Sequence, residues 1–134
     1  MDVNICGFCT KKDILCEFCS KKDILTPNEY QRLAARTMRT DLSAKETEKH
    51  ALFGMAAELG ELHGIYQKTY QCHEFDSEHA KKELGDMLWF VAEYCTARRW
   101  NLEDIMRLNI EKLRARYPDG FEGERSLHRA EGDI

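Results

Sequence analysis

The residues best suited to chemistry are two near-identical acidic segments, ELGE at 58–61 and ELGD at 83–86. On a helix, side chains three positions apart lie one above the other, so each segment presents two carboxylates on one face. Two such helices side by side would bring four acidic groups together, and like charges held that close repel unless a cation lies among them. The pattern therefore predicts a divalent-metal site with these ligands: Glu58, Glu61, Glu83 and Asp86.

The ligand type indicates which metal such a site would hold. Carboxylate oxygens without histidine or thiolate at the right spacing favour Mg²⁺, or Mn²⁺, over zinc. A di-iron bundle would need Glu-x-x-His on paired helices, and neither segment has it. The alternative is a pair of solvated acidic faces, as most acidic residues on helices are. The doubling, the small or apolar neighbours Gly54, Ala57 and Phe90, and the missing i,i+4 lysines favour the metal site.

Capping signals and apolar periodicity predict four helices and no strand. Thr26 and Ser43 each begin a capping box, Asn101 is a further N-cap, and Pro118 with Gly120 stops the last helix. The expected helices span 27–40, 43–71, 77–98 and 101–117. The fold class is therefore all-α, a four-helix bundle over residues 26–121, followed by a polar tail at 122–134.

The two long helices carry continuous apolar stripes, and the acidic pairs lie beside these stripes rather than in them. The stripe residues are Leu52, Met55, Leu59, Leu62 and Tyr66 in one helix, and Leu84, Leu88, Val91 and Cys95 in the next. Gly60 and Gly85 each cost about 1 kcal/mol relative to Ala inside a helix. We therefore expect a helix or a ligand to approach closely at these glycines.

A Mg²⁺ ion held by a few carboxylates keeps positions open for substrate phosphates. Candidate substrate-binding residues are Asn109, Lys112 and Arg116 on the last helix, Lys68 two turns beyond Glu61, and Trp89, which would stack on a base. Each has a structural alternative: a helix-to-helix hydrogen bond for Asn109, surface cations for the three basic residues, and a core position for Trp89.

Composition limits the other classes of function. The 134 residues, 43% of them apolar, suffice for one domain, and 20 basic against 24 acidic residues give a net charge of −4. That balance disfavours binding to a nucleic-acid polymer or an anionic membrane. No apolar run approaches the roughly 20 residues of a membrane span, and the first residues do not resemble a secretion signal, so we expect a cytoplasmic protein.

The first 25 residues form a duplicated arm, in which CGFCTKKDIL is followed by CEFCSKKDIL. Its four thiols, Cys6, Cys9, Cys16 and Cys19, make up the ligand set of a structural Zn²⁺ site. Only six residues separate the two pairs, which makes tetrahedral closure tight. The alternative is an arm with reactive thiols.

The two acidic pairs are followed by a third motif, Asn109-x-x-Lys112-Leu113-x-x-Arg116-Tyr117-Pro118. Together these motifs resemble those of the MazG-like all-α nucleoside triphosphate pyrophosphohydrolases, and the resemblance covers about residues 27–121. The resemblance implies hydrolysis of a nucleoside triphosphate between the α and β phosphates. It also implies that the four carboxylates hold Mg²⁺ and that Lys112, with Asn109 and Arg116, meets the phosphates. On chemical grounds, a carboxylate not fully used as a ligand would orient or deprotonate the attacking water, and we assign this role to Glu61. Family members often carry a further acidic residue where this chain has Ala57. They usually complete the active site with a neighbouring subunit, so a homodimer or tetramer is expected.

Two other functions remain open from the sequence. Related enzymes cleave different nucleotides, and phosphoribosyl-ATP is one alternative substrate. A non-catalytic helical module, with a metal- or redox-responsive cysteine arm, is the other alternative.

Overall fold

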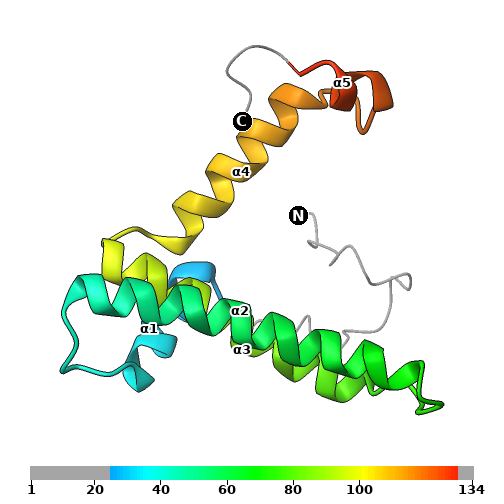
Figure 1. Ribbon diagram of the computed structural model, residues 1–134. Helices are drawn as coiled ribbons and strands as arrows, with labels where there is room; N and C mark the ends of the chain where they lie inside the picture. The colour runs from blue at the N-terminus through cyan, green and yellow to red at the C-terminus, as the bar shows by residue number, and fades with distance from the viewer. Residues whose placement is uncertain (1–24, 130–134) are drawn as a thin grey trace, which may run out of the picture.

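The computed structural model describes residues 25–129, and every regular element among them is a helix (Figure 1). In chain order these are α1 (Pro27–Ala34), the 3₁₀ helix η2 (Ala35–Thr37), α2 (Ala44–Thr69), α3 (Ser77–Arg98), α4 (Leu102–Arg116) and α5 (Gly123–Leu127). The expected all-α class is confirmed.

Side-chain caps fix where the helices begin. Thr26 Oγ1 accepts the backbone N–H of Glu29 at 3.1 Å. Ser43 and Glu46 form the reciprocal capping box expected for α2. Asp76 Oδ1 accepts the backbone N–H of His79 at 3.0 Å and starts α3. The predicted starts of these helices are thus within one residue of those observed.

One helix boundary and one additional helix differ from the prediction. The first α-helix ends at Ala34 rather than near Thr40, because the chain tightens into η2 and then turns to extended backbone at Met38. The Thr37 hydroxyl donates to the Ala34 carbonyl at 3.0 Å and so supports the tightened turn. The polar tail also contains the short helix α5, which was not predicted.

The antiparallel helices α2 and α3 form the main body of the molecule and lie side by side along most of their length (Figure 1). Three cross-helix pairs define their register: His50 with Glu93, Gly54 with Phe90, and Glu58 with Glu83. Small residues such as Ala51 and Ala80 are buried along this contact. The contact face is therefore the one that carries the acidic residues.

Helix α1 packs across α3 and reaches the start of α4. The Gln31 side chain joins these elements, donating to Thr96 Oγ1 at 3.1 Å and accepting the Leu102 backbone N–H at 2.7 Å. At Arg99 the backbone adopts φ 57°, a left-handed end to α3 that redirects the chain. Helix α4 then points away from α2 and α3 (Figure 1), so the expected four-helix bundle is not closed within one chain.

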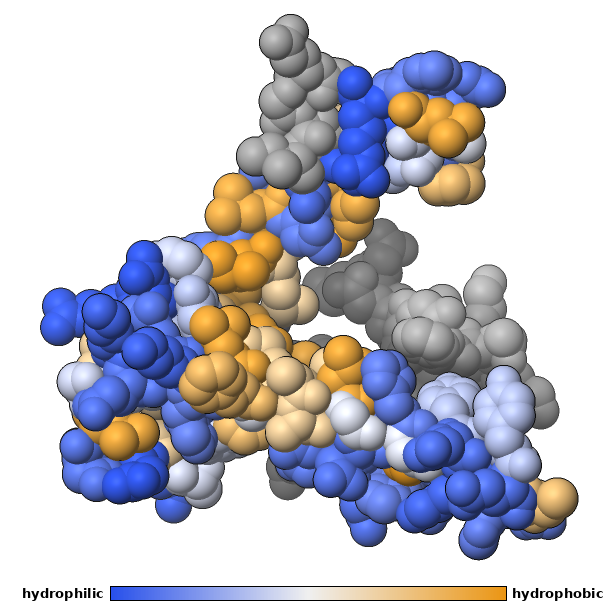
Figure 2. All heavy atoms as spheres, viewed as in Figure 1, coloured by the Kyte–Doolittle hydropathy of each residue, from blue (hydrophilic) through white to orange (hydrophobic). Residues whose placement is uncertain are grey.

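The apolar stripes predicted for the core are largely exposed in the single chain. Leu59 is 41% exposed and Leu88 54%, and a hydrophobic area covers the middle of the helix pair (Figure 2). The reason is that α2 and α3 meet through their acidic, small-residue faces, about 100° around each helix from the stripes.

In the described part of the chain, no helix has an apolar stretch sufficient to cross a bilayer.

Candidate metal centre

Three of the four predicted ligands converge between α2 and α3. Oxygen atoms of Glu58, Glu83 and Asp86 all lie within 4.8 Å of one another. Glu83 is only 8% exposed, Glu58 is half-buried and Asp86 faces solvent. The cluster thus has a buried base and an open side.

Glu58 is held in an environment that opposes its charge. Loss of water by burial raises its pKa, and so do a hydrogen bond with the Glu83 carboxyl and the charges of Asp86, Glu83 and Glu61. A hydrogen bond between two carboxyl groups requires a proton on one of them. The neutral form of the Glu58 carboxyl is therefore favoured relative to an ordinary glutamate as long as no cation lies beside it.

This arrangement fits a hard divalent cation. The donors are all oxygens, they converge from two rigid helices, and their mutual repulsion would be relieved by a positive ion. One exposed ligand leaves room for water or a substrate oxygen, as Mg²⁺ and Mn²⁺ sites usually do. The residues that would hold the ion are Glu58, Glu83 and Asp86.

Glu61 lies one turn further along α2, exposed and outside this three-carboxylate cluster. Its charge nonetheless contributes to raising the pKa of Glu58, so it is a near neighbour. Its assignment as a ligand or as the group that activates water stays a prediction.

A histidine supports the cluster from one side. His79 Nε2 lies 2.6 Å from Glu83 Oε1, one turn earlier on α3. This contact was not predicted from the sequence. The i,i+4 spacing of the two residues is the sequence signal for this contact.

Aromatic side chains border the cluster on the turn after Asp86. The Phe90 ring fills the space beside Gly54, and the Trp89 indole packs edge-on against it, with ring centroids 5.0 Å apart. Trp89 Nε1 also donates to Thr37 Oγ1 at 2.9 Å. On α1, burial and the nearby Asp86 charge raise the pKa of Tyr30, a neighbour that the sequence did not indicate.

The predicted substrate-binding residues other than Trp89 are not gathered at the cluster in one chain. Lys68 is exposed near the end of α2. Asn109 and Lys112 are exposed on α4, and Arg116 is half-buried at its end beside the Tyr117 ring. Since α4 points away from the helix pair (Figure 1), these three residues are carried away from the carboxylates.

The close approach expected at Gly60 and Gly85 is not found within one chain, because a Cβ at either position would meet no atom within 4 Å. The tight contact is at Gly54 instead. The repeated ELG segment did not indicate Gly54, since spacing identifies a helix face but not the residue on which the neighbouring helix packs.

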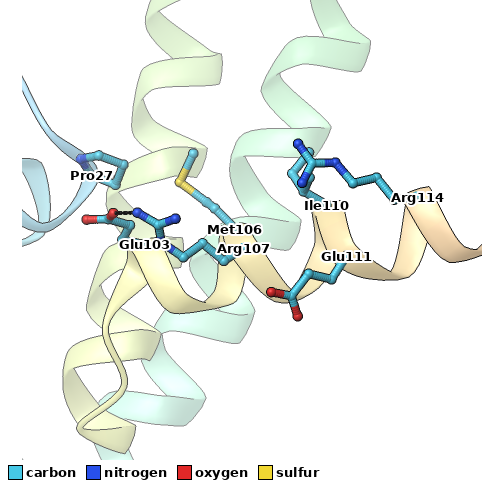
Figure 3. A pocket seen from close by; sticks show the side chains of 7 residues that line it. All are labelled: Pro27, Glu103, Met106, Arg107, Ile110, Glu111 and Arg114. Atoms are coloured by element: carbon cyan, nitrogen blue, oxygen red, sulfur yellow. Dashed lines mark hydrogen bonds and ion pairs between the residues drawn. The ribbon is translucent and has the colours of Figure 1, made fainter.

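Two surface hollows lie apart from the carboxylates. One, of about 270 Å³, lies between the start of α1 and the side of α4 (Figure 3), with an ion pair between Arg107 and Glu103 in its wall. The other, of about 240 Å³, is apolar and continues the exposed stripes toward α4; it is lined by Leu52, Met55, Val91, Tyr94, Cys95, Trp100 and Ile105.

The predicted zinc ligands Cys6, Cys9, Cys16 and Cys19 lie outside the described residues. Of the cysteines within them, Cys72 is exposed and Cys95 is buried, and both are free thiols. Burial raises the pKa of Cys95, which disfavours the reactive thiolate form.

Comparison with known proteins identifies the domain. A model of the MazG nucleotide pyrophosphohydrolase domain matches residues 46–121, a segment that includes both acidic pairs and all of α4. No curated protein and no solved structure gives a match. The match covers more than half of the sequence and agrees with the all-helical fold. The chain therefore belongs to the MazG nucleotide pyrophosphohydrolase domain family.

Proposed function

We propose that this protein is a Mg²⁺-dependent hydrolase that cleaves a nucleoside triphosphate between its α and β phosphates, giving the monophosphate and pyrophosphate. The observation that supports this most directly is the convergence of Glu58, Glu83 and Asp86 between two helices of the family segment. Mn²⁺ would serve in place of Mg²⁺ because it accepts the same oxygen ligands.

The carboxylates would share the work according to their positions. The buried Glu83 and the half-buried Glu58 would hold the cation from the helix interface, and the exposed Asp86 would bind it on the solvent side. The bound ion would neutralise triphosphate charge and lower the pKa of water. The exposed Glu61 accepts a proton from the attacking water. The water oxygen bonds to the α-phosphorus, the α–β bridging P–O bond breaks, and pyrophosphate leaves with the bonding electrons.

The active unit is a homo-oligomer. The stripes of α2 and α3 fall on the same side of the helix pair, since Leu52 and Met55 share the apolar hollow with Val91 and Cys95. A continuous apolar face of this kind is typical of an interface. A second copy covering it would also provide a way to bring Asn109, Lys112 and Arg116 of one subunit to the carboxylates of the other.

A substrate panel tests the activity. The full-length protein is incubated with Mg²⁺ and each common ribo- and deoxyribonucleoside triphosphate, and with phosphoribosyl-ATP, and the products are separated by ion-exchange chromatography. We expect equal amounts of monophosphate product and pyrophosphate from at least one substrate. No turnover with any of them, with Mg²⁺ or Mn²⁺, would contradict the proposal and favour the non-catalytic module.

Variants then test the assignment of roles. Asp86→Asn and Glu61→Gln should each abolish turnover while the helical circular dichroism signal is unchanged. Glu74→Gln, an exposed acidic residue in the turn between α2 and α3, is the matched control and should keep full activity. If Asp86→Asn and Glu61→Gln both retain activity, the carboxylate assignment is wrong.

A further inference from the structure

The contact between His79 and Glu83 has a use that the proposed function leaves open. We propose that His79 is a positioning residue, which holds the Glu83 carboxyl in the orientation needed to bind the cation. The inference rests on the proposed metal role of Glu83. It concerns how the site is prepared rather than what reaction it performs.

The backbone position of His79 is fixed independently of the contact with Glu83. Its backbone N–H donates to the N-cap carboxylate of Asp76 at 3.0 Å, which places it in the first turn of α3. From there, the i,i+4 spacing directs its ring along the helix to Glu83. The distance from Nε2 to Oε1 is 2.6 Å.

The burial of Glu83 separates this contact from an ordinary surface pair. Exposed i,i+4 pairs contribute only a few tenths of a kcal/mol, because both side chains have water as an alternative partner. The Glu83 side chain is only 10% exposed, whereas that of His79 is 41% exposed. A donor at Oε1 therefore restricts rotation of a carboxyl that has little water around it.

The chemical consequence is a division of the two carboxyl oxygens. Oε1 accepts from Nε2, whether the ring is the neutral Nε2–H form or the imidazolium. Oε2 then remains for the cation. A partner that orients a ligand in this way typically changes metal affinity by about 10- to 100-fold. His79 would thus influence metal affinity without touching metal or substrate.

Metal binding by the full-length protein tests the role without relying on turnover. Isothermal titration with Mn²⁺, after removal of bound metal, gives a Kd for each variant. His79→Gln places an amide nitrogen near the position of Nε2, whereas the shorter His79→Asn does not reach it. We expect His79→Gln to remain within about 3-fold of the original protein and His79→Asn to bind about 10-fold more weakly or worse.

A kinetic measurement supplies a second readout. At low Mg²⁺ the His79→Asn variant should be slow, and saturating Mg²⁺ should restore kcat, because only the population of the metal-bound state has changed. His73→Ala, an exposed histidine in the turn before α3, is the control and should match the original protein in both assays.

The outcomes separate this inference from the proposed function. Equal Mn²⁺ affinity of the Gln and Asn variants, in a protein that binds Mn²⁺ and hydrolyses nucleotides, overturns the role of His79 and leaves the activity intact. A protein that turns over nucleotide but shows no Mn²⁺ binding overturns the positioning role as well. Absence of both binding and turnover would overturn the proposed function together with it.

Discussion

The ring of Phe90 on α3 lies against Gly54 on α2, in the space that a larger side chain at position 54 would need. Glu58 follows one turn after Gly54, and Asp86 precedes Phe90 by one turn. The glycine therefore sets how closely the two helices approach beside the carboxylate cluster. In this way the apolar contact between Gly54 and Phe90 controls the spacing of the predicted metal ligands.

Substitution of Gly54 by Ala should separate the helices at this point. The added methyl group would overlap Phe90, and overpacking of this kind costs about 1–3 kcal/mol. We expect a lower urea midpoint and a higher Kd for Mn²⁺. Gly64→Ala is the control, since a Cβ there meets no atom within 4 Å and helix propensity alone should add about 0.5–1 kcal/mol of stability. Equal behaviour of the two variants would show that Phe90 does not set the helix spacing.

The pKa of Glu58 predicts how stability depends on pH without metal. A carboxyl whose pKa is raised on folding binds its proton more tightly in the folded state, so the folded state loses stability as pH rises above about 4.3. Glu58→Gln should remove that loss. The informative quantity is the difference between the two proteins, measured by urea unfolding in EDTA from pH 4 to pH 8. Added Mg²⁺ should reverse the loss at high pH.

Other carboxylates change stability with pH in the opposite direction, and their contributions must be subtracted. Hydrogen bonds from Arg39 lower the pKa of Asp41, and those from Ser43 lower the pKa of Glu46. Both carboxylates therefore stabilise the folded state at pH values above their ordinary pKa, and this stabilisation is lost as pH falls. These contributions are the same in the Glu58→Gln variant. A pH profile that this substitution leaves unchanged would contradict the raised pKa of Glu58.

The sequence predicted the helices and the acidic cluster because both depend on local signals. The Ser43 capping box and the N-cap Asp76 act over three residues, and the spacing of the carboxylates follows from helix geometry. The packing face of α2 was not predictable in this way. Periodicity identifies the apolar stripe around Leu59, but whether this stripe meets α3 or another molecule depends on the whole assembly.

Two further features depended on backbone and tertiary contacts that the sequence does not display. The direction of α4 follows from the left-handed conformation of Arg99, a residue type that gives no warning of it. The burial of Glu93, which is only 1% exposed, depends on His50 from another helix 43 residues away in the sequence. An acidic residue on a long helix is normally exposed, so nothing in the local sequence indicates that Glu93 is buried.

The pair of His50 and Glu93 predicts a large effect on stability. His50 Nδ1 lies 2.8 Å from Glu93 Oε2, and replacement of His50 by Leu would leave a buried carboxylate without this partner. The loss should be about 1–3 kcal/mol in urea unfolding at pH 7 and fixed protein concentration. The double variant His50→Leu/Glu93→Leu should recover part of it, since the unpaired charge is then absent. No recovery in the double variant would show that the pair acts only through packing.

If the exposed apolar stripe is the subunit interface, a single charge placed in it should prevent oligomerisation. Leu88 is 54% exposed in the middle of the stripe, and Leu88→Glu would place a carboxylate in the proposed interface. We expect sedimentation velocity to show an oligomer for the original protein and a monomer for the variant. Tyr70→Glu at the tip of the α2–α3 pair, where Tyr70 is 91% exposed, should not change the sedimentation coefficient. A monomeric original protein would contradict the proposed assembly.

Removal of the cysteine arm should leave catalysis intact. The carboxylates and the whole family segment lie beyond residue 45, and the cap that starts α1 is Thr26. A chain that begins at Leu25 therefore retains the cap of α1 and every carboxylate proposed to bind the metal. Its kcat/KM with the best substrate should match that of the full-length protein within about 2-fold, because no residue of the arm is proposed to stabilise the transition state. Loss of all turnover in the shortened chain, with its helices still formed, would show that the arm belongs to the active site.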